Sequence, residues 1–365
     1  MRVLVVNAGS SSLKLRLLDG QDAMQNSADL PDGPGGFDAS RLAELLSGWA
    51  EPDVIGHRIV HGGTAFSGPV QIDDAVRQQL RDLTDLAPLH QPKSLAALDA
   101  VTELLPGITA VASFDTAFHA TIPAAAATYA IPREWRSRYG IRRYGFHGLS
   151  HAYCSRRAAQ LLDLPIAGLR VITCHLGAGA SLAAVLGGRS VDTTMGFTPL
   201  EGLIMATRSG TVDPGLVLWL EEHEHLSPHE VATALESRSG LLALAGTADM
   251  REVQAAAERG EPDACNAIDV YIHRLVGGIA SMSAATGGVD VLAFTGGVGE
   301  NSAMVRRRAA QRLGFLGVAV DGHRNDSAHD DHDISATGAA VRTMVITARE
   351  DLQIASEARR LIGAR

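Results

Sequence analysis

The chain has 365 residues, of which 46% are hydrophobic and 20% are charged. This length predicts about two domains with a sizeable core. Thirty-two basic and 41 acidic residues give a net charge of −9, and only 4% of residues are aromatic, so the composition disfavours nucleic acid and anionic membranes as partners.

The opening run "MRVLVVNAG" is too short for a secretory signal, and no segment has the apolar length of a membrane span. Cys154, Cys174 and Cys265 are widely separated and form no C-x-x-C pair, so they indicate neither a disulfide framework nor a zinc site. We therefore expect a cytoplasmic α/β protein.

Alternation of apolar and polar residues predicts strands over 2–7 and 13–19, joined by a turn of small polar residues. A third apolar segment, "DVIGHRIVHGG", is followed by helical periodicity from residue 75 up to Pro88. The segment "ITAVASFDTAF" predicts a strand that ends at Asp115, and the Ala/Pro-rich stretch that follows predicts a domain boundary near residue 118.

Residues 170–192 repeat the layout of the chain's start: an apolar strand, a small-residue turn and a second apolar strand. The corresponding segments are "VNAGSSSLKL" and "CHLGAGASLAA". Such hairpins also arise by chance, but we favour a duplication. A third glycine-rich turn, at 289–302, follows another apolar strand and precedes a predicted helix over 303–315.

Glycine turns at strand ends expose backbone N–H groups to an approaching anion, so these turns predict phosphate binding. No G-x-x-x-x-G-K-[ST] loop is present. The run "GAGASL" has Leu182 where the last glycine of G-x-G-x-x-G belongs, so the common nucleotide-binding loops are excluded.

The motifs resemble those of one family along essentially the whole chain. They are "VNAGSSSLK", "HRIVHGG", "LAPLH", "FDTAFH", "RRYGFHGLSH", "HLGAGAS", "VDTTMGFTPLEGLIMATRSGTVDPG", "SGLLALAG" and "GGVGEN". In this order they resemble the acetate kinases, within the wider group of propionate and butyrate kinases.

The resemblance implies a duplicated ribonuclease-H-like fold of the actin and hexokinase type, with ATP between two lobes. It implies one lobe over 1–117 plus 351–365, and a second over 118–350 that carries the nucleotide site and the dimer surface. The implied reaction is reversible transfer of the γ-phosphoryl group of ATP to acetate, which gives acetyl phosphate and ADP. Magnesium, or manganese in its place, and a homodimer are also implied.

Arg58 and Arg208 resemble the family's two catalytic arginines, whose planar guanidinium groups suit carboxylate and phosphoryl oxygens. Arg58 also interrupts the apolar segment "VIGHRIV", where an unpaired charge would be costly. His147 matches the residue that contacts the transferring phosphoryl group, and Asp115 matches an essential aspartate.

The resemblance assigns further residues to three binding roles. Arg58, together with an apolar wall for the acyl group, is implied to bind substrate; the wall consists of Val60, Leu89, Phe146 and Pro199. Asn7 and Glu350 are implied to hold the metal. The ATP-binding residues are implied to be Ser10, Ser12, Lys14, His175, Gly177, Ala178, Gly179, Asp249, Arg251, Gly296, Gly297, Gly299 and Asn301.

The sequence departs from the family pattern at several positions, including "APLHQPKS", where the family has "APLHNPPN". Ala178 replaces an asparagine in the second glycine turn, Arg349 stands beside the predicted metal carboxylate, and Gly296 replaces an alanine. These changes leave a pyrophosphate-dependent acetate kinase, or one with an unusual nucleotide donor, as an alternative. Because an apolar wall discriminates one methylene only weakly, a propionate or butyrate kinase is a further alternative. An actin- or chaperone-like nucleotide-switch ATPase is an alternative of another class.

Overall fold

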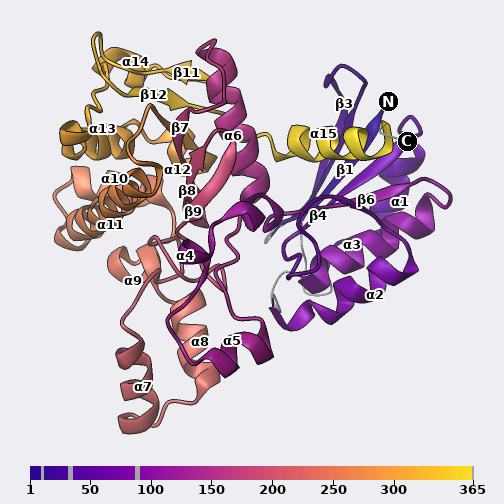
Figure 1. Ribbon diagram of the computed structural model, residues 1–365, viewed down its shortest axis with the longest axis horizontal. Helices are drawn as coiled ribbons and strands as arrows, with labels where there is room; N and C mark the ends of the chain where they lie inside the picture. The colour runs from indigo at the N-terminus through magenta and orange to yellow at the C-terminus, as the bar shows by residue number, and fades with distance from the viewer. Residues whose placement is uncertain (10–11, 32–35, 87–90, 364–365) are drawn as a thin grey trace. The chain divides into compact units, whose positions relative to one another are not determined.

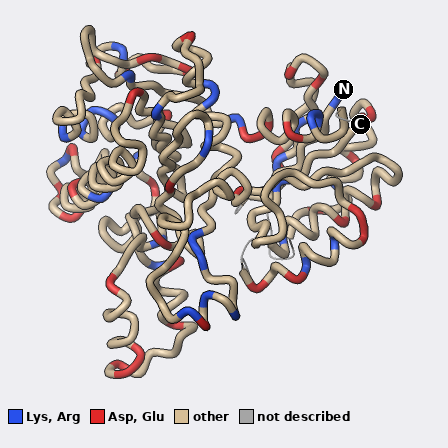
Figure 2. The backbone as a smooth tube through the Cα atoms, viewed as in Figure 1, with Lys and Arg blue, Asp and Glu red and all other residues tan. Residues whose placement is uncertain are grey.

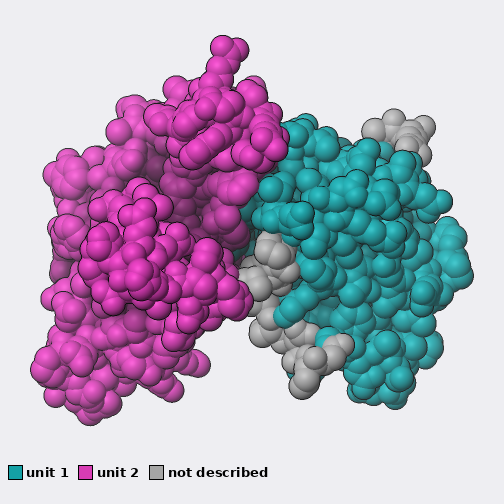
Figure 3. Space-filling model, turned by 90° about the horizontal axis from the view of Figure 1, so that it is seen from below, with its two compact units in different colours: residues 1–120, 146–153, 349–365 teal, residues 121–145, 154–348 magenta. Residues whose placement is uncertain are grey.

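The computed structural model describes residues 1–9, 12–31, 36–86 and 91–363. These residues form two compact units, coloured separately in Figure 3. Unit 1 comprises Met1–Ala120, Phe146–Tyr153 and Arg349–Arg365. Unit 2 comprises Thr121–Gly145 and Cys154–Ala348.

Unit 1 contains a mixed sheet of six described strands in the order β3-β2-β1-β4-β6-β5 (Figure 1). The strands β1, β4 and β6 are parallel neighbours, and the other three pair antiparallel. Their bounds are β1 (Val3–Ala8), β2 (Ser12–Leu18), β3 (Met24–Pro31), β4 (Val54–Ile59), β5 (Val70–Gln71) and β6 (Ala110–Phe114).

The two faces of this sheet are buried against different helices because successive side chains of a strand point to opposite faces. Leu4 and Val6 pack on the side of α1 (Ala39–Ser47) and α3 (Gln91–Leu104). Val3 and Val5 pack on the side of α15 (Glu350–Gly363), which contacts β1, β4 and β6. The α15 face is the one that carries the candidate site.

The other α-helices of unit 1 are α2 (Asp74–Asp82), which covers only the first part of the helix predicted from residue 75, and the first residues of α6 (Gly148–Leu161). A short 3-10 helix, Ala117–Thr121, follows the end of β6. Leu149 of α6 is buried with Val3, Val5 and Ile354, so the beginning of α6 belongs to the core on the α15 face.

Unit 2 contains a second sheet of six described strands, in the order β11-β12-β10-β7-β8-β9. Their bounds are β7 (Arg170–Leu176), β8 (Ala180–Leu186), β9 (Arg189–Thr193), β10 (Val291–Thr295), β11 (His332–Asp333) and β12 (Arg342–Val345). Its helices include α4 (Ala124–Ala127), α5 (Arg133–Tyr139), α7 (Pro214–His223), α8 (Pro228–Ser237), α9 (Gly240–Ala245), α10 (Met250–Glu258), α11 (Pro262–Thr286), α12 (Gly296–Asn301), α13 (Ala303–Arg312) and α14 (Gly322–Asp326).

The two sheets have the same topology, strand for strand. In each, the first strand in chain order pairs antiparallel with the second and parallel with the fourth. The sixth strand pairs parallel with the fourth, and the fifth pairs antiparallel with the sixth. The predicted hairpins at the chain's start and at 170–192 are therefore equivalent elements, and the duplication is confirmed. Among the described residues, no helix is both long and apolar enough to span a membrane.

Candidate active site

Three predicted side chains of unit 1 lie on one face of the sheet because their positions share the alternation of that face. Asn7 follows Val3 and Val5 at the end of β1, Arg58 follows Val54 in β4, and Asp115 follows Val111 at the end of β6. Since β1, β4 and β6 are parallel neighbours, their carboxyl ends meet at one edge. That edge is where open α/β sheets bind ligands.

Arg58 and Asp115 form a buried, bidentate ion pair. Arg58 Nη2 lies 2.6 Å from Asp115 Oδ2, and Arg58 Nε lies 3.2 Å from each carboxylate oxygen. Burial raises the pKa of Asp115, and the Arg58 guanidinium opposes that rise. Burial alone would lower the pKa of Arg58, but the carboxylates of Asp115 and Glu350 outweigh it and raise that pKa. The arginine therefore stays charged in a site that excludes much of the water.

Asn7 and Glu350 complete this cluster. Arg58 Nη1 donates to Asn7 Oδ1 at 3.1 Å, and Asn7 Nδ2 donates to Glu350 Oε2 at 3.0 Å. Glu350 is the first residue of α15, where a helix dipole favours a carboxylate. An amide and a carboxylate are hard oxygen donors that fit Mg²⁺, which usually takes only one or two protein ligands and completes its shell with water and phosphate oxygens.

The first glycine turn is described only in part. Ser10 lies outside the described residues, whereas Ser12 begins β2 and its carbonyl accepts a hydrogen bond from Gly9 N at 2.9 Å. Lys14 lies directly opposite Asn7 in the β1–β2 ladder, and it is exposed. The predicted lysine thus lies beside the buried cluster and reaches solvent.

His147 immediately precedes α6 and has a positive φ of 56°, a region that few residues with a Cβ adopt. The next residue, Gly148, donates its N–H to the Asp115 carbonyl at 2.8 Å. A Cβ on Gly148 would lie 2.2 Å from that carbonyl oxygen, so only glycine allows this approach. His147 is therefore held next to the backbone of Asp115.

The predicted acyl wall is also partly described. Val60 and Phe146 are buried in unit 1, and the Phe146 ring meets the ring of His61, the residue after Val60, edge-on at 5.5 Å. Pro199 is half-buried in unit 2. Leu89 lies outside the described residues.

In unit 2 the second and third glycine turns meet at the ends of the parallel neighbours β7 and β10. A Cβ at Gly177 would lie 3.7 Å from His175 Nε2 and 3.9 Å from Gly297 N. Gly296 has a φ of 79°, and a Cβ there would approach the Leu176 carbonyl oxygen at 2.8 Å. This arrangement brings together the imidazole of His175 and the backbone of both turns, which is what phosphate binding by glycine turns requires.

The other predicted ATP residues of unit 2 lie around or after these turns. Gly177 N donates to Gly179 O at 2.9 Å across the second turn, and Gly299 is buried in α12. Asn301 is exposed, and its Nδ2 donates to Gly297 O at 2.8 Å. Asp249 caps α10 and pairs with the exposed Arg251.

Arg208 lies in the long segment between β9 and α7. Burial lowers its pKa, and Glu236 opposes that shift. Its backbone carbonyl accepts a hydrogen bond from Met205 N at 3.2 Å. The same segment carries Pro199, so one long connection supplies two of the predicted site residues.

This segment is braced by a polar network that the sequence did not suggest. Arg143 Nη2 lies 2.6 Å from Glu201 Oε1, its guanidinium lies over the Tyr129 ring, and the Tyr129 hydroxyl donates to Glu201. A Cβ on Gly196 would collide with the Glu201 and Tyr129 side chains. The glycine of "TMGFTP" is therefore required by the network, and only the tertiary structure reveals it.

The structure also places the departures from the family pattern. Ala178 is exposed at the tip of the second turn, and its carbonyl accepts a hydrogen bond from Ala206 N at 3.1 Å. The Arg349 guanidinium pairs with Asp351, with Nη2 and Oδ2 at 2.8 Å. Hydrogen bonding to Asp351 raises the pKa of Arg349. Arg349 is thus engaged by the carboxylate on the other side of Glu350.

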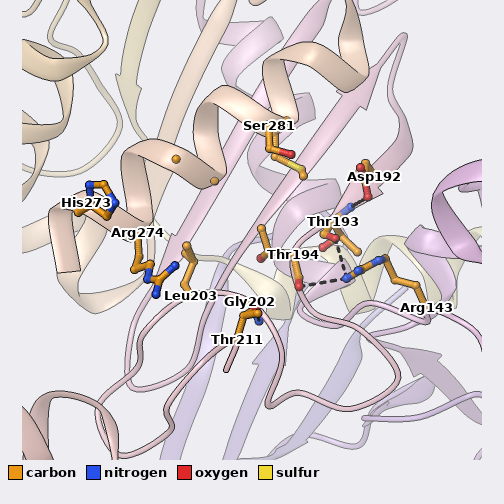
Figure 4. Close-up of a pocket in the computed structure, with 13 residues that line it drawn as sticks. Arg143, Asp192, Thr193, Thr194, Gly202, Leu203, Thr211, His273, Arg274 and Ser281 are labelled. Carbon is orange, nitrogen blue, oxygen red and sulfur yellow. Dashed lines mark hydrogen bonds between the residues drawn. The ribbon is translucent and has the colours of Figure 1, made fainter. Parts of the chain in front are cut away.

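A separate pocket of about 370 Å³ lies in unit 2, between α11 and the end of β9 (Figure 4). Arg143 lines it and donates to the backbone carbonyls of Thr193 and Thr194. None of the described residues lining it is a predicted site residue. This pocket is therefore separate from the predicted site residues of unit 2.

Residues 40–356 match the profile of the Acetokinase family. The chain belongs to the acetokinase family. It is 45% identical over 355 residues to an acetate kinase from Nostoc punctiforme, a match that covers 95% of this chain and 87% of that one.

Solved structures of acetate and propionate kinases are similar to this chain over almost its whole length. A Porphyromonas gingivalis acetate kinase has a TM-score of 0.90 and 36% identity, covering 99% of each chain. A Francisella tularensis propionate kinase has a TM-score of 0.90 and 35% identity, covering 98% of this chain and 99% of that one. A Thermus thermophilus ROK hexokinase, 16% identical with a TM-score of 0.51, shares the fold alone.

The acetokinase family catalyses ATP-dependent phosphorylation of acetate, so this chain is a kinase that transfers phosphate to a carboxylate. This membership separates it from nucleotide-switch proteins of the same fold. The predicted duplicated, actin-like fold is confirmed by the matching sheets and by the neighbouring structures.

Proposed function

We propose that this enzyme transfers the γ-phosphoryl group of Mg·ATP directly to acetate, with no phosphorylated protein intermediate. The observation that carries the proposal is the buried Arg58–Asp115 pair at the carboxyl ends of β4 and β6. A transfer between two anions needs fixed positive charge more than covalent chemistry. A preorganised guanidinium in a partly dry site provides that charge.

Each residue has a defined role in this mechanism. Arg58, oriented by Asp115, neutralises the acetate carboxylate and the developing charge on the phosphoryl group. Arg208 and His147 donate to the phosphoryl oxygens, and the glycine turns of unit 2 donate backbone N–H groups to the remaining phosphates. Val60 and Phe146 exclude water beside the methyl group of acetate.

The donor set supports a role for Asn7 and Glu350 in holding Mg²⁺, directly or through water. When bound, the ion neutralises the charge on the phosphate oxygens of ATP. The hydrogen bond between Asn7 and Glu350 keeps both groups at the end of β1, where the ion would be needed.

Acetyl phosphate trapping with hydroxylamine tests the reaction. Purified enzyme is assayed with ATP, GTP or pyrophosphate against acetate, propionate or butyrate. We expect product with ATP and acetate, and near-complete loss of it in a folded Arg208→Ala variant. Full activity of that variant would remove Arg208 from the mechanism, and a preference for pyrophosphate would replace ATP as donor.

Acetate is proposed as the preferred acceptor and propionate as the second. One methylene changes binding to an apolar wall by only about 1–3 kcal/mol, so both should be used. The similarity to the structure of a propionate kinase supports propionate as the second acceptor. A higher kcat/KM for propionate than for acetate would reverse this order.

We also propose a homodimer through unit 2. Helix α7 has no buried residue, and it exposes Leu216, Leu218 and Trp219, ahead of an acidic end that Figure 2 shows in red. Such an apolar helix suits an interface between copies. Light scattering should report twice the chain mass for the wild type and a smaller species for Leu218→Glu, while a wild-type monomer would refute the dimer.

A further inference from the structure

The segment that carries Phe146 and His147 has an unusual backbone that must be held from outside. Gly145 has a φ of 73° and His147 a φ of 56°, so two of three consecutive residues are left-handed. The left-handed region is unfavourable for a residue with a Cβ, and it persists only where surrounding structure enforces it. The contacts of this segment therefore determine where the His147 side chain lies.

One such contact comes from His119, which the mechanism above does not use. Its Nε2 lies 3.0 Å from the Phe146 carbonyl oxygen. A carbonyl only accepts, so His119 donates from Nε2–H. The second contact is the hydrogen bond from Gly148 N to the Asp115 carbonyl. Together the two bonds join both sides of His147 to residues 115–119.

His119 is well suited to this role. Its side chain is completely buried, and its ring meets the rings of His151 and Phe118 edge-on at 5.7 and 5.6 Å. Burial lowers the pKa of His119 to about 4, so the ring is neutral at physiological pH. A neutral N–H donor supports the peptide without adding a buried charge to this segment.

We propose that His119 is a positioning residue, which fixes the Phe146–His147 peptide and so sets the place of His147 relative to Asp115. The proposal rests on the proposed function, because His147 matters only if the enzyme transfers a phosphoryl group. It assigns a role in the reaction to the last residue of "FDTAFH".

Two substitutions separate the hydrogen bond from simple packing. His119→Phe keeps an aromatic ring but removes the donor. His119→Gln loses the ring but can place an amide N–H near the position of Nε2. His57→Phe is the matched control, because His57 is another buried histidine of unit 1, and its position in β4 is on the opposite face of the sheet from Arg58.

We expect His119→Phe to lower kcat for acetyl phosphate formation about 10- to 100-fold, since misplacing a reacting group by about 1 Å costs that much. We expect KM for ATP to stay within about twofold, because the glycine turns of unit 2 are untouched. His119→Gln should recover most of the activity, and His57→Phe should keep it. Hydrogen exchange over 146–153 should rise in the phenylalanine variant and not in the glutamine variant.

Wild-type kcat in a folded His119→Phe enzyme would overturn the proposal. So would equal losses in His119→Phe, His119→Gln and His57→Phe, which would indicate general destabilisation. If the phenylalanine variant does not fold, His119→Leu, which is less bulky than phenylalanine and also lacks the donor, replaces it in the comparison with glutamine. A wild-type enzyme that forms no acetyl phosphate from ATP and acetate would overturn the proposed function, and the His119 proposal with it.

Discussion

The buried pair of Arg58 and Asp115 makes a quantitative prediction about stability. The change is Asp115→Asn, which keeps the shape of the side chain and removes its charge. The Asp115 side chain is 1% exposed and that of Arg58 13%, so the substitution leaves a guanidinium without its main counter-charge in a site with little water. Removing one partner of a buried pair costs about 3–5 kcal/mol of unfolding free energy.

We expect a loss near the lower limit, about 3 kcal/mol, because two other groups still face Arg58. Asn7 Oδ1 accepts from it at 3.1 Å, and Glu350 Oε2 lies 4.0 Å from its Nε. Asp29→Asn is the matched control. It makes the same chemical change at a half-exposed pair with Arg16 in the same unit, where the expected loss is about 0.2–1 kcal/mol.

Urea unfolding followed by tryptophan fluorescence measures both losses. The chain has three tryptophans, and Trp49 packs against the core of unit 1. Replacing the half-exposed Trp135 and Trp219 by phenylalanine in every variant leaves Trp49 as the reporter of that unit. A loss for Asp115→Asn no larger than that for Asp29→Asn would refute the reasoning.

The double variant Arg58→Met with Asp115→Leu tests the cause of the loss. If the cost arises from an unpaired buried charge, removing both charges should restore part of the stability lost in Asp115→Asn. A double variant that is less stable than Asp115→Asn would show instead that packing, and not charge, dominates at this site.

Two further predictions concern pH and the glycine turns. Burial lowers the pKa of His57 to about 3 and those of His61 and His119 to about 4. Unfolding lets these rings bind protons below their ordinary pKa of about 6.5, so their contribution to stability is present above that pH and is lost as the pH falls. From pH 7 to 5 the three histidines together should lower the unfolding free energy by an amount on the order of 5 kcal/mol, measured from urea unfolding followed by the Trp49 reporter. A flat profile would contradict this. A Cβ at Gly297 meets nothing within 4 Å, so Gly297→Ala should leave Tm unchanged yet raise KM for ATP about tenfold by obstructing a phosphate, whereas an unchanged KM would place the phosphates elsewhere.

Local sequence patterns predicted those elements whose burial follows a simple period. The strands β1, β2, β4, β6, β7 and β10 were expected near their observed positions, because their apolar residues repeat at the spacing of a buried face. Strand β3 was not predicted. It is polar, with Leu30 as its buried residue, since it lies at the edge of the sheet and pairs through its backbone.

Part of the candidate site was also predictable from the apolar pattern of a strand. A charge within an apolar strand is costly unless it is paired, so the segment "VIGHRIV" singled out Arg58, although it did not identify Asp115 as the partner. The role inferred for His119 was not predictable, because it depends on a carbonyl 27 residues away in the chain. Nor does any local pattern indicate that residues 146–153 belong to unit 1.

The two units share one topology, but the ends of their equivalent parallel strands carry different chemical groups. In unit 1 the three parallel strands β1, β4 and β6 carry polar or charged side chains at or just after their ends: Asn7, Arg58 and Asp115. In unit 2 the equivalent strands β7 and β10 end in glycine turns, and β12 is followed by the buried Ile346. Strand ends that are equivalent in the two sheets therefore carry charged and amide side chains in unit 1, and glycines or an apolar residue in unit 2.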